Sequence, residues 1–213
     1  KNGIIGILID SIGSSATPTL KLQNTEIYNH SNFGILARET NIEAHNVVIG
    51  SAGQASLAAT IGGTYNFTHS TFANYWNSGI RQLPAVLVNN FFAYTDETGQ
   101  EIIETRDLKA ANFTNCIFDG NNNIEFLIDK VNGGGLFNYS LKNCLIKFND
   151  SNNSYADIAE VDFSNNSNYN SIILNGSLNF RDTQKSDFII GAESEAINKA
   201  ITTPFSIDLL GID

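Results

Sequence analysis

Charged residues, proline, methionine and cysteine are all scarce in this chain of 213 residues. Lys, Arg, Asp and Glu make up 16% of it, against about 25% in a typical soluble domain. The 12 basic and 22 acidic residues give a net charge of −10, which opposes phosphate backbones and anionic lipid surfaces. We therefore expect no nucleic-acid partner and no electrostatic membrane docking. Apolar runs are strand-sized, so the sequence also predicts no transmembrane segment.

Cysteine and methionine give two further expectations. The two cysteines, Cys116 and Cys144, are too few for the disulfide scaffold of a small secreted domain and leave the redox compartment open. No residue is Met, and the chain starts at Lys1 without an apolar leader. Because the stretch from Ile4 to Ile9 already reads as a buried strand, we expect a fragment of a longer protein.

Asparagine is abundant instead, with 29 residues, and part of it follows a repeat. The pattern is apolar-x-Asn-x-x-apolar, with successive separations of 22, 23, 20, 26 and 28 residues and His in place of Asn in one unit. A distorted seventh unit is centred on Asn175. The six central positions are Asn24, Asn46, His69, Asn89, Asn115 and Asn143.

The repeat predicts an all-β solenoid. Between the central positions lie β-branched and aromatic runs bounded by Gly, Asn and Ser, without helical periodicity. Units this short must stack to bury a core, which gives a parallel β-helix with coils of about 20–28 residues. At each bend an Asn is expected to bond inward-pointing backbone and the Asn of the next coil, forming a ladder in which His69 has a structural and not a catalytic role.

The whole chain, residues 1–213, is expected to form one domain. Two loops, 95–109 and 150–170, interrupt the period. A short helix is predicted from Glu193 to Ala200, with Ser194 as its cap. The segment 193–213 would then cover the open end of the solenoid.

The chain resembles the right-handed parallel β-helix proteins found as surface or secreted lipoproteins in Bacteroidota, which share the pectate-lyase-like superfold. The resemblance covers most of the chain and rests on the Asn repeats, on the stretches Gly62–Trp76 and Tyr169–Asn175, and on the ending Ser194–Lys199. It implies a bacterial extracellular or outer-membrane surface location and an N-terminal lipid anchor that is missing here. The chain departs from the family in having Leu178-Asn179 before Phe180, where an Asp-Pro pair is common, and in stopping at Asp213 before the usual tail. No activity is assigned to such proteins, and the fold alone implies none.

Catalytic and metal-binding patterns are weak. Glycan hydrolases of this fold need paired carboxylates, and the lyases need an acidic calcium site with a basic residue. The isolated pieces, Arg81 with Pro84 and Asp107 between Arg106 and Lys109, are interpreted as salt bridges or solvated loops. The stretch Asp119–Glu125 starts like a calcium loop but lacks its later Gly and Glu, and His30, His45 and His69 lack zinc-ligand spacing. We assign no catalytic residue, metal or cofactor.

Tyr75, Trp76 and Arg81 are the candidate ligand-binding residues. An aromatic pair beside a lone Arg is suited to sugar stacking or protein docking, and core packing of the Trp is the alternative. Cys116 and Cys144 follow Asn residues of consecutive units, so they are expected to stack as buried, mostly reduced thiols.

The sequence favours a non-catalytic module for binding or scaffolding at the cell surface, with a protein or a polysaccharide as partner. A subunit of an outer-membrane assembly is a related hypothesis. The alternative from another class is a polysaccharide lyase or glycoside hydrolase acting on extended glycans.

Overall fold

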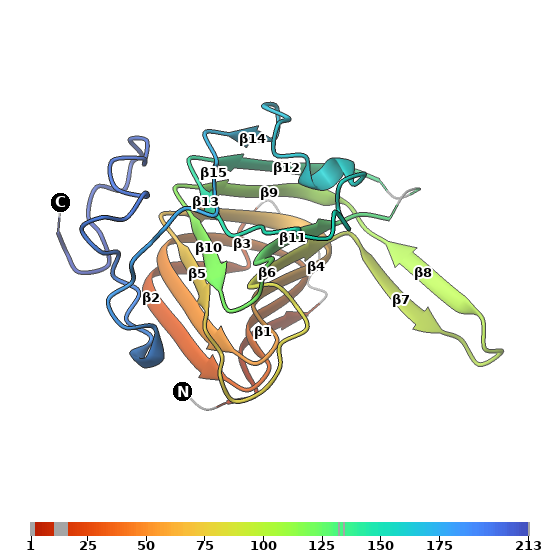
Figure 1. Cartoon of the computed structure of the whole chain (residues 1–213). Coiled ribbons are helices and arrows are strands. Elements are labelled where there is room, and N and C mark those ends of the chain that lie inside the picture. Colours follow the sequence, from red (N-terminus) through yellow and green to blue (C-terminus); the bar gives the residue numbers. More distant parts are fainter. Residues whose placement is uncertain (1–2, 11–16, 132, 134, 213) are drawn as a thin grey trace.

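The protein is built on parallel strands in a curled, solenoid-like sheet, in agreement with the prediction of an all-β solenoid (Figure 1). The structure is a computed structural model that describes residues 3–10, 17–131, 133 and 135–212. The two ends of the predicted domain, Lys1 and Asp213, lie outside the described residues. Within the part that is described, no helix has the length and apolar character to cross a membrane.

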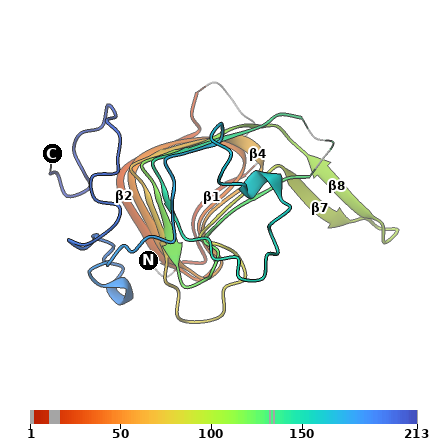
Figure 2. The ribbon, with the colours of Figure 1, turned by 45° about the horizontal axis from the view of Figure 1, so that its top comes forward.

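The strands fall into three faces that curl around a common interior (Figure 2). The first face contains β1 (Ile5–Asp10), the start of β3 (Phe33–Ala52), the start of β4 (Ala55–Thr68), β6 (Val86–Asn89) and β11 (Phe126–Asp129). The second contains the start of β2 (Leu20–His30), the middle of β3, the end of β4, β9 (Leu108–Thr114), β12 (Phe137–Lys142) and β14 (Tyr169–Asn170). The third contains the ends of β2 and β3, β5 (Thr71–Asn74), β10 (Ile117–Gly120), β13 (Leu145–Ile146) and β15 (Ile173–Leu174).

The core consists of side chains that repeat at equivalent positions of successive coils. Alternate residues of a strand point inward, and parallel in-register pairing places like residues above one another. Phe67 and Phe113 stack with ring centroids 5.6 Å apart, and Phe72 and Phe118 stack at 5.3 Å. All four side chains are buried, and each such burial stabilises the fold by about 1.5–3 kcal/mol.

A left-handed backbone conformation marks the corner between the second and third faces. Here φ is +47° to +55° at one residue per coil, and Asn tolerates this region better than most residues do. The corner residues, called the corner row below, are Asn24, Asn46, His69, Asn115, Asn143 and Ser171. Five of the six predicted repeat centres therefore lie at this corner.

The placement of Asn89 in that repeat was wrong. Asn89 ends β6 on the first face, opposite Asp129, and its Oδ1 accepts the Ile61 backbone N–H at 2.9 Å. His69 and Asn115 belong to consecutive coils although 46 residues separate them, because the coil between contains a long loop and a hairpin. Asn175 is also outside the corner row, where Ser171 takes its place.

The predicted loop 95–109 is largely an antiparallel hairpin. Strands β7 (Phe91–Thr95) and β8 (Glu101–Thr105) pair with each other and project from the solenoid. The second predicted loop, 150–170, is irregular as expected and contains the 3₁₀ turn η1 (Ala159–Val161). Its Phe163 packs against Phe148 and Tyr169, with ring centroids 4.9 and 4.8 Å apart, so this loop covers the last coil.

The C-terminal prediction was wrong in two respects. Residues 193–200 form turns and no helix, because Asn198 takes a left-handed conformation at φ +60°. Residues 177–212, called the C-terminal segment, include the 3₁₀ turn η2 (Thr183–Lys185) and run along the side of the solenoid beside β2, not over its end (Figures 1 and 2).

The cysteine prediction is confirmed in its main points. Cys116 and Cys144 are both free and buried. They precede Ile117 and Leu145, which pair in adjacent coils, and the Leu145 N–H donates to the Cys116 carbonyl at 3.0 Å. The two thiols therefore extend the interior stack as small apolar groups.

Candidate functional site

The C-terminal segment crosses the coils along the corner row and is held there by its backbone. Asn143 Nδ2 donates to the Lys199 carbonyl at 2.7 Å. One coil away, Asn115 makes two bonds to Ile201: its Nδ2 donates to the carbonyl at 2.8 Å and its Oδ1 accepts the N–H at 2.9 Å. These hydrogen bonds are made to backbone groups of the segment and not to its side chains.

The contacts continue over the next two coils. His69 Nε2 lies 2.7 Å from Thr203 Oγ1, and the His45 ring stacks on Phe205 with centroids 3.8 Å apart. Asn46 Nδ2 then donates to the Ile207 carbonyl at 2.6 Å. From Lys199 to Ile207, every second residue of the segment meets the solenoid, which is the periodicity of an extended chain.

Four corner-row side chains, those of Asn46, His69, Asn115 and Asn143, point outward and bond the C-terminal segment, so the predicted inward hydrogen bonding was wrong. Neighbouring corner-row side chains also contact each other in two places. Asn46 Nδ2 donates to Asn24 Oδ1 at 3.1 Å, and Asn115 Nδ2 lies 3.3 Å from His69 Nε2. Burial, reinforced by His45 nearby, lowers the pKa of His69. The ring is therefore neutral near pH 7, as a hydrogen-bonding corner residue requires.

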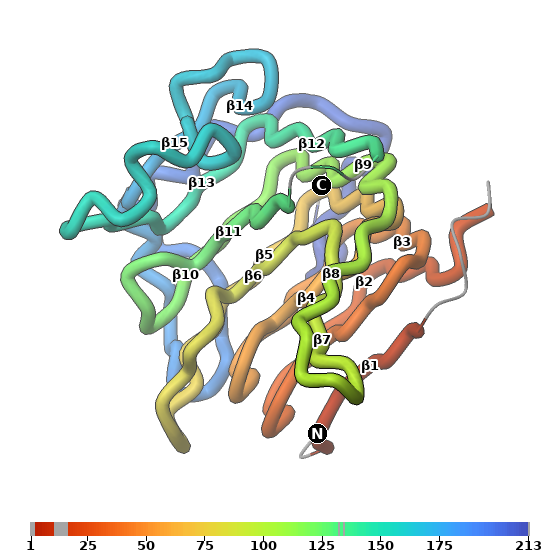
Figure 3. Tube along the Cα trace, turned by 90° about the vertical axis from the view of Figure 1, so that its right-hand side faces the viewer, coloured from red at the N-terminus to blue at the C-terminus, as the bar shows by residue number. Residues whose placement is uncertain are grey.

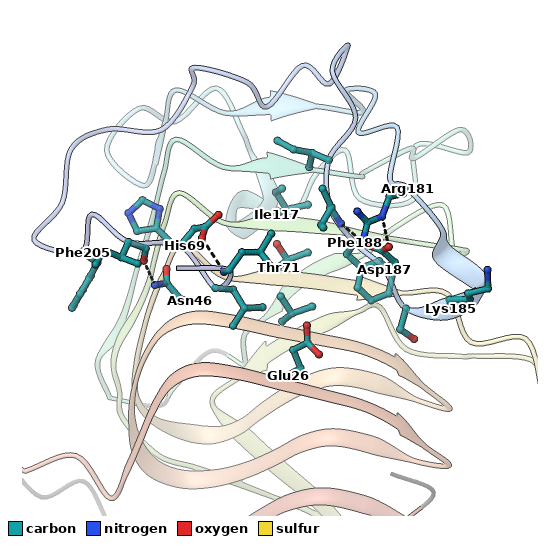
Figure 4. Close-up of a pocket in the computed structure, with 18 of the residues that line it drawn as sticks. Glu26, Asn46, His69, Thr71, Ile117, Arg181, Lys185, Asp187, Phe188 and Phe205 are labelled. Carbon is teal, nitrogen blue, oxygen red and sulfur yellow. Dashed lines mark hydrogen bonds and ion pairs between the residues drawn. The ribbon is translucent and has the colours of Figure 1, made fainter. Parts of the chain in front are cut away.

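A cavity of about 560 Å³ separates the outer side of the third face from the C-terminal segment (Figure 4). Its walls include Val48 and Ile117 from the solenoid and Phe188, Ile189 and Leu209 from the segment. Charged groups at the cavity come from Glu26, Lys185 and Asp208 and from the ion pair of Arg181 with Asp187. The cavity thus combines apolar walls with polar and charged groups, as ligand pockets commonly do.

Gly50 permits the close approach that forms one side of the cavity. A Cβ at this position would lie 2.6 Å from the Phe188 ring and 2.6 Å from the Ala73 carbonyl oxygen. Phe188 packs in turn against Tyr75 and Phe180, with ring centroids 6.0 and 5.4 Å apart. Any larger residue at position 50 would displace Phe188 from the solenoid surface.

The three predicted ligand-binding residues do not form one patch. Tyr75 is half-buried under the C-terminal segment, and its hydroxyl donates to Asp119 Oδ2 at 2.6 Å. Half-buried Trp76 borders a separate, smaller pocket of about 300 Å³ beside Asn29 and Ser31. Arg81 is buried, so its guanidinium is not available to a ligand on the surface.

Arg81 instead forms a buried ion pair with Glu125. The pair makes two hydrogen bonds, one of them 2.9 Å from Arg81 Nη1 to Glu125 Oε2. Glu125 also accepts the backbone N–H groups of Ala85 and Asn122, both at 2.7 Å. Burial raises the pKa of Glu125, and Arg81 and the two backbone donors oppose that shift. This fully enclosed pair locks the loop that follows β5 to the turn before β11.

The sequence did not predict the pairing of Arg81 with Glu125, because 44 residues separate them and nothing local to either residue marks the pair. The sequence did not predict the cavity either, because one side of it comes from β2, β3, β5 and β10 and the other from residues 181–210. Among the described residues, no group of three His, Cys, Asp or Glu side chains is placed to hold a metal ion.

Comparisons of the chain with models of known protein families, with curated proteins and with solved structures find no match. The cavity and the corner row are therefore the observations from which a function has to be inferred.

Proposed function

We propose that the protein is a non-catalytic binding module whose cavity, roofed by the C-terminal segment, receives an apolar group of a protein partner. The observation that carries this proposal is the cavity of about 560 Å³ between the third face and the C-terminal segment. This volume lies within the range of about 300–1,000 Å³ typical of ligand sites.

The chemistry of the walls favours a protein partner over a polysaccharide. Val48, Ile117 and Ile189 offer no hydrogen bonds, whereas a sugar carries many hydroxyl groups that lose water on binding. An aliphatic or aromatic side chain gives up no hydrogen bonds to water there and gains about 25 cal/mol for each Å² of apolar surface that it buries. The charged groups of Arg181 and Asp187 would then orient the polar backbone of the partner.

The proposal includes the finer fold, a right-handed parallel β-helix with a continuous ladder at the corner row. It is supported by one left-handed residue per coil and by the side-chain contacts of Asn46 with Asn24 and of Asn115 with His69. A bacterial cell-surface location, through a lipid anchor upstream, is the part of the proposal that rests on the family resemblance.

The cavity can be tested with Nile red, a neutral apolar dye whose fluorescence rises in apolar sites. Thr71, half-buried on the third face, lines the cavity, so Thr71→Trp should fill it. The matched control is Thr64→Trp, which adds the same bulk to a half-buried position of the second face. We expect saturable binding that Thr71→Trp weakens at least about tenfold and that Thr64→Trp leaves unchanged. Equal affinities in all three proteins would contradict the assignment of the cavity.

The proposal that the protein does not cleave glycans needs a separate assay. The intact protein is incubated with a panel of anionic and neutral polysaccharides, and unsaturated products and new reducing ends are measured. We expect neither to form. Turnover at ordinary enzyme rates, about 1 per second or faster, would replace the binding module with a glycan-cleaving enzyme.

A further inference from the structure

The hairpin of β7 and β8 stands out from the solenoid (Figures 1 and 3). It also exposes large apolar side chains. Phe92 is 50% exposed, Tyr94 39% and Ile103 46%. The rings of Phe92 and Tyr94 stack on one another with centroids 5.7 Å apart, so this apolar surface is already ordered. A two-stranded hairpin buries little by itself, which makes such exposure costly without a partner.

The hydrogen-bond pattern of the hairpin shows which backbone groups of β7 point away from β8. The Arg106 N–H donates to the Asn90 carbonyl and the Asp96 N–H to the Gln100 carbonyl, both at 2.9 Å. Hydrogen-bonded pairs alternate with non-bonded pairs in antiparallel strands. Ala93, opposite Ile103, is therefore in a non-bonded pair, and its N–H and C=O point to the outer edge.

That edge has none of the usual protection against pairing with another chain. Edge strands commonly contain Lys, Pro or a bulge, but the five residues of β7, Phe91–Thr95, include neither a charge nor a proline. In the sheet that the structure describes, β7 pairs with β8 alone. The outer edge of β7 is thus open to a further strand.

Charge indicates the kind of chain that would pair there. Residues 91–105 contain four acidic residues, Asp96, Glu97, Glu101 and Glu104, and no Lys or Arg. A second copy of the protein would bring the same four negative charges and a total charge of −10, so self-pairing is opposed electrostatically. A basic segment would instead be attracted.

We propose that the outer edge of β7 is a docking site for an extended segment of a protein partner in which basic and apolar residues alternate. The segment adds as a third strand, its backbone bonding Phe91, Ala93 and Thr95 and its apolar side chains covering Phe92 and Tyr94. This surface is separate from the cavity, so the two sites can be tested independently.

The test uses a fluorescently labelled synthetic peptide that alternates lysine and valine, with binding to the intact protein followed by anisotropy. We expect saturable binding that weakens as the salt concentration rises. Ala93→Pro removes one outward N–H without touching a bond to β8, and Ala93→Lys places a like charge beside the peptide. Each should weaken binding about tenfold. Because Ala93→Lys keeps every backbone donor, it separates loss of docking from loss of the hairpin.

Two matched controls define the edge and the charge. Ile103→Pro makes the same change at the outward position of β8 and should leave binding unchanged, and a peptide alternating glutamate and valine should not bind. Thr71→Trp, which fills the cavity, should leave the lysine peptide bound with its original affinity. The proposal is overturned if Ala93→Lys has no effect, if Ile103→Pro is as damaging as Ala93→Pro, or if the acidic peptide binds equally well.

Discussion

Asn115 combines two roles that substitution can separate. Its backbone is left-handed, at φ +55°, and its side chain makes two hydrogen bonds to Ile201 of the C-terminal segment. Asn115→Gly removes the side-chain bonds but takes the left-handed conformation without strain. Asn115→Ala removes the same bonds and must also hold a Cβ in that conformation. Both variants therefore lose the hydrogen bonds to Ile201, and only the Ala variant also strains the backbone.

The magnitudes follow from those contacts. Two hydrogen bonds at about 1 kcal/mol each reduce the free energy of opening the segment by about 2 kcal/mol, so the hydrogen-exchange protection of Ile201 should fall about 30-fold in both variants. The free energy of global unfolding should be lower in the Ala variant than in the Gly variant by about 1 kcal/mol. The fall in protection is measured by hydrogen-exchange mass spectrometry, and the difference in unfolding free energy by urea denaturation.

The two readouts can fail separately. Unchanged protection of residues 199–205 in both variants would show that the corner row does not hold the C-terminal segment. Equal unfolding free energies for the two variants would show that position 115 is not left-handed. Asn112→Ala is a control on the exposed side of β9, the strand that ends just before Asn115, because Asn112 Nδ2 bonds Asn66 at 2.8 Å and not the segment.

Three further predictions concern the buried pair, the corner histidine and the thiols. Arg81→Met leaves Glu125 buried without its cation and should lower the free energy of unfolding by about 3–5 kcal/mol in urea denaturation, and adding Glu125→Leu should restore much of it; a loss below about 1 kcal/mol would contradict the burial of the pair. The pKa of His69 is lower in the folded protein than its ordinary value of 6.5. The unfolded chain then binds more protons between those values, and stability should decrease as pH falls below about 6.5. His30 has a lowered pKa as well, so the contribution of His69 is the part of this pH dependence that His69→Asn removes. Burial raises the pKa of Cys116, so maleimide labelling should be slow in the native protein and reach both thiols after denaturation; fast native labelling of either would place it outside the core.

The stacked strands could be predicted from the sequence because the same short residue pattern recurs at the corners of successive coils. Asn at the corner, with apolar residues two before and three after it, marks one left-handed turn between two buried strands. The prediction failed at Asn89 because separations of 20 and 26 residues imitate two ordinary coils, although a single coil of 46 residues lies between His69 and Asn115.

The candidate site could not be predicted, because it is formed by contacts between residues that lie far apart in the sequence. Asn46 bonds a carbonyl 161 residues away, and Arg81 meets Glu125 across 44 residues. The predicted helix at 193–200 had suitable composition and a Ser194 cap, whose Oγ does accept the Ala196 N–H at 3.2 Å. Contacts with the corner row then keep the following residues extended, which a helix would not allow.

A crystal structure of the protein with Nile red would test the central claim most directly. The dye should lie between Ile117, Phe188 and Phe205, with the C-terminal segment still bonded to Asn115 and Asn143. Dye bound elsewhere on the protein, with the cavity between the third face and the segment empty or closed, would contradict the proposed binding module.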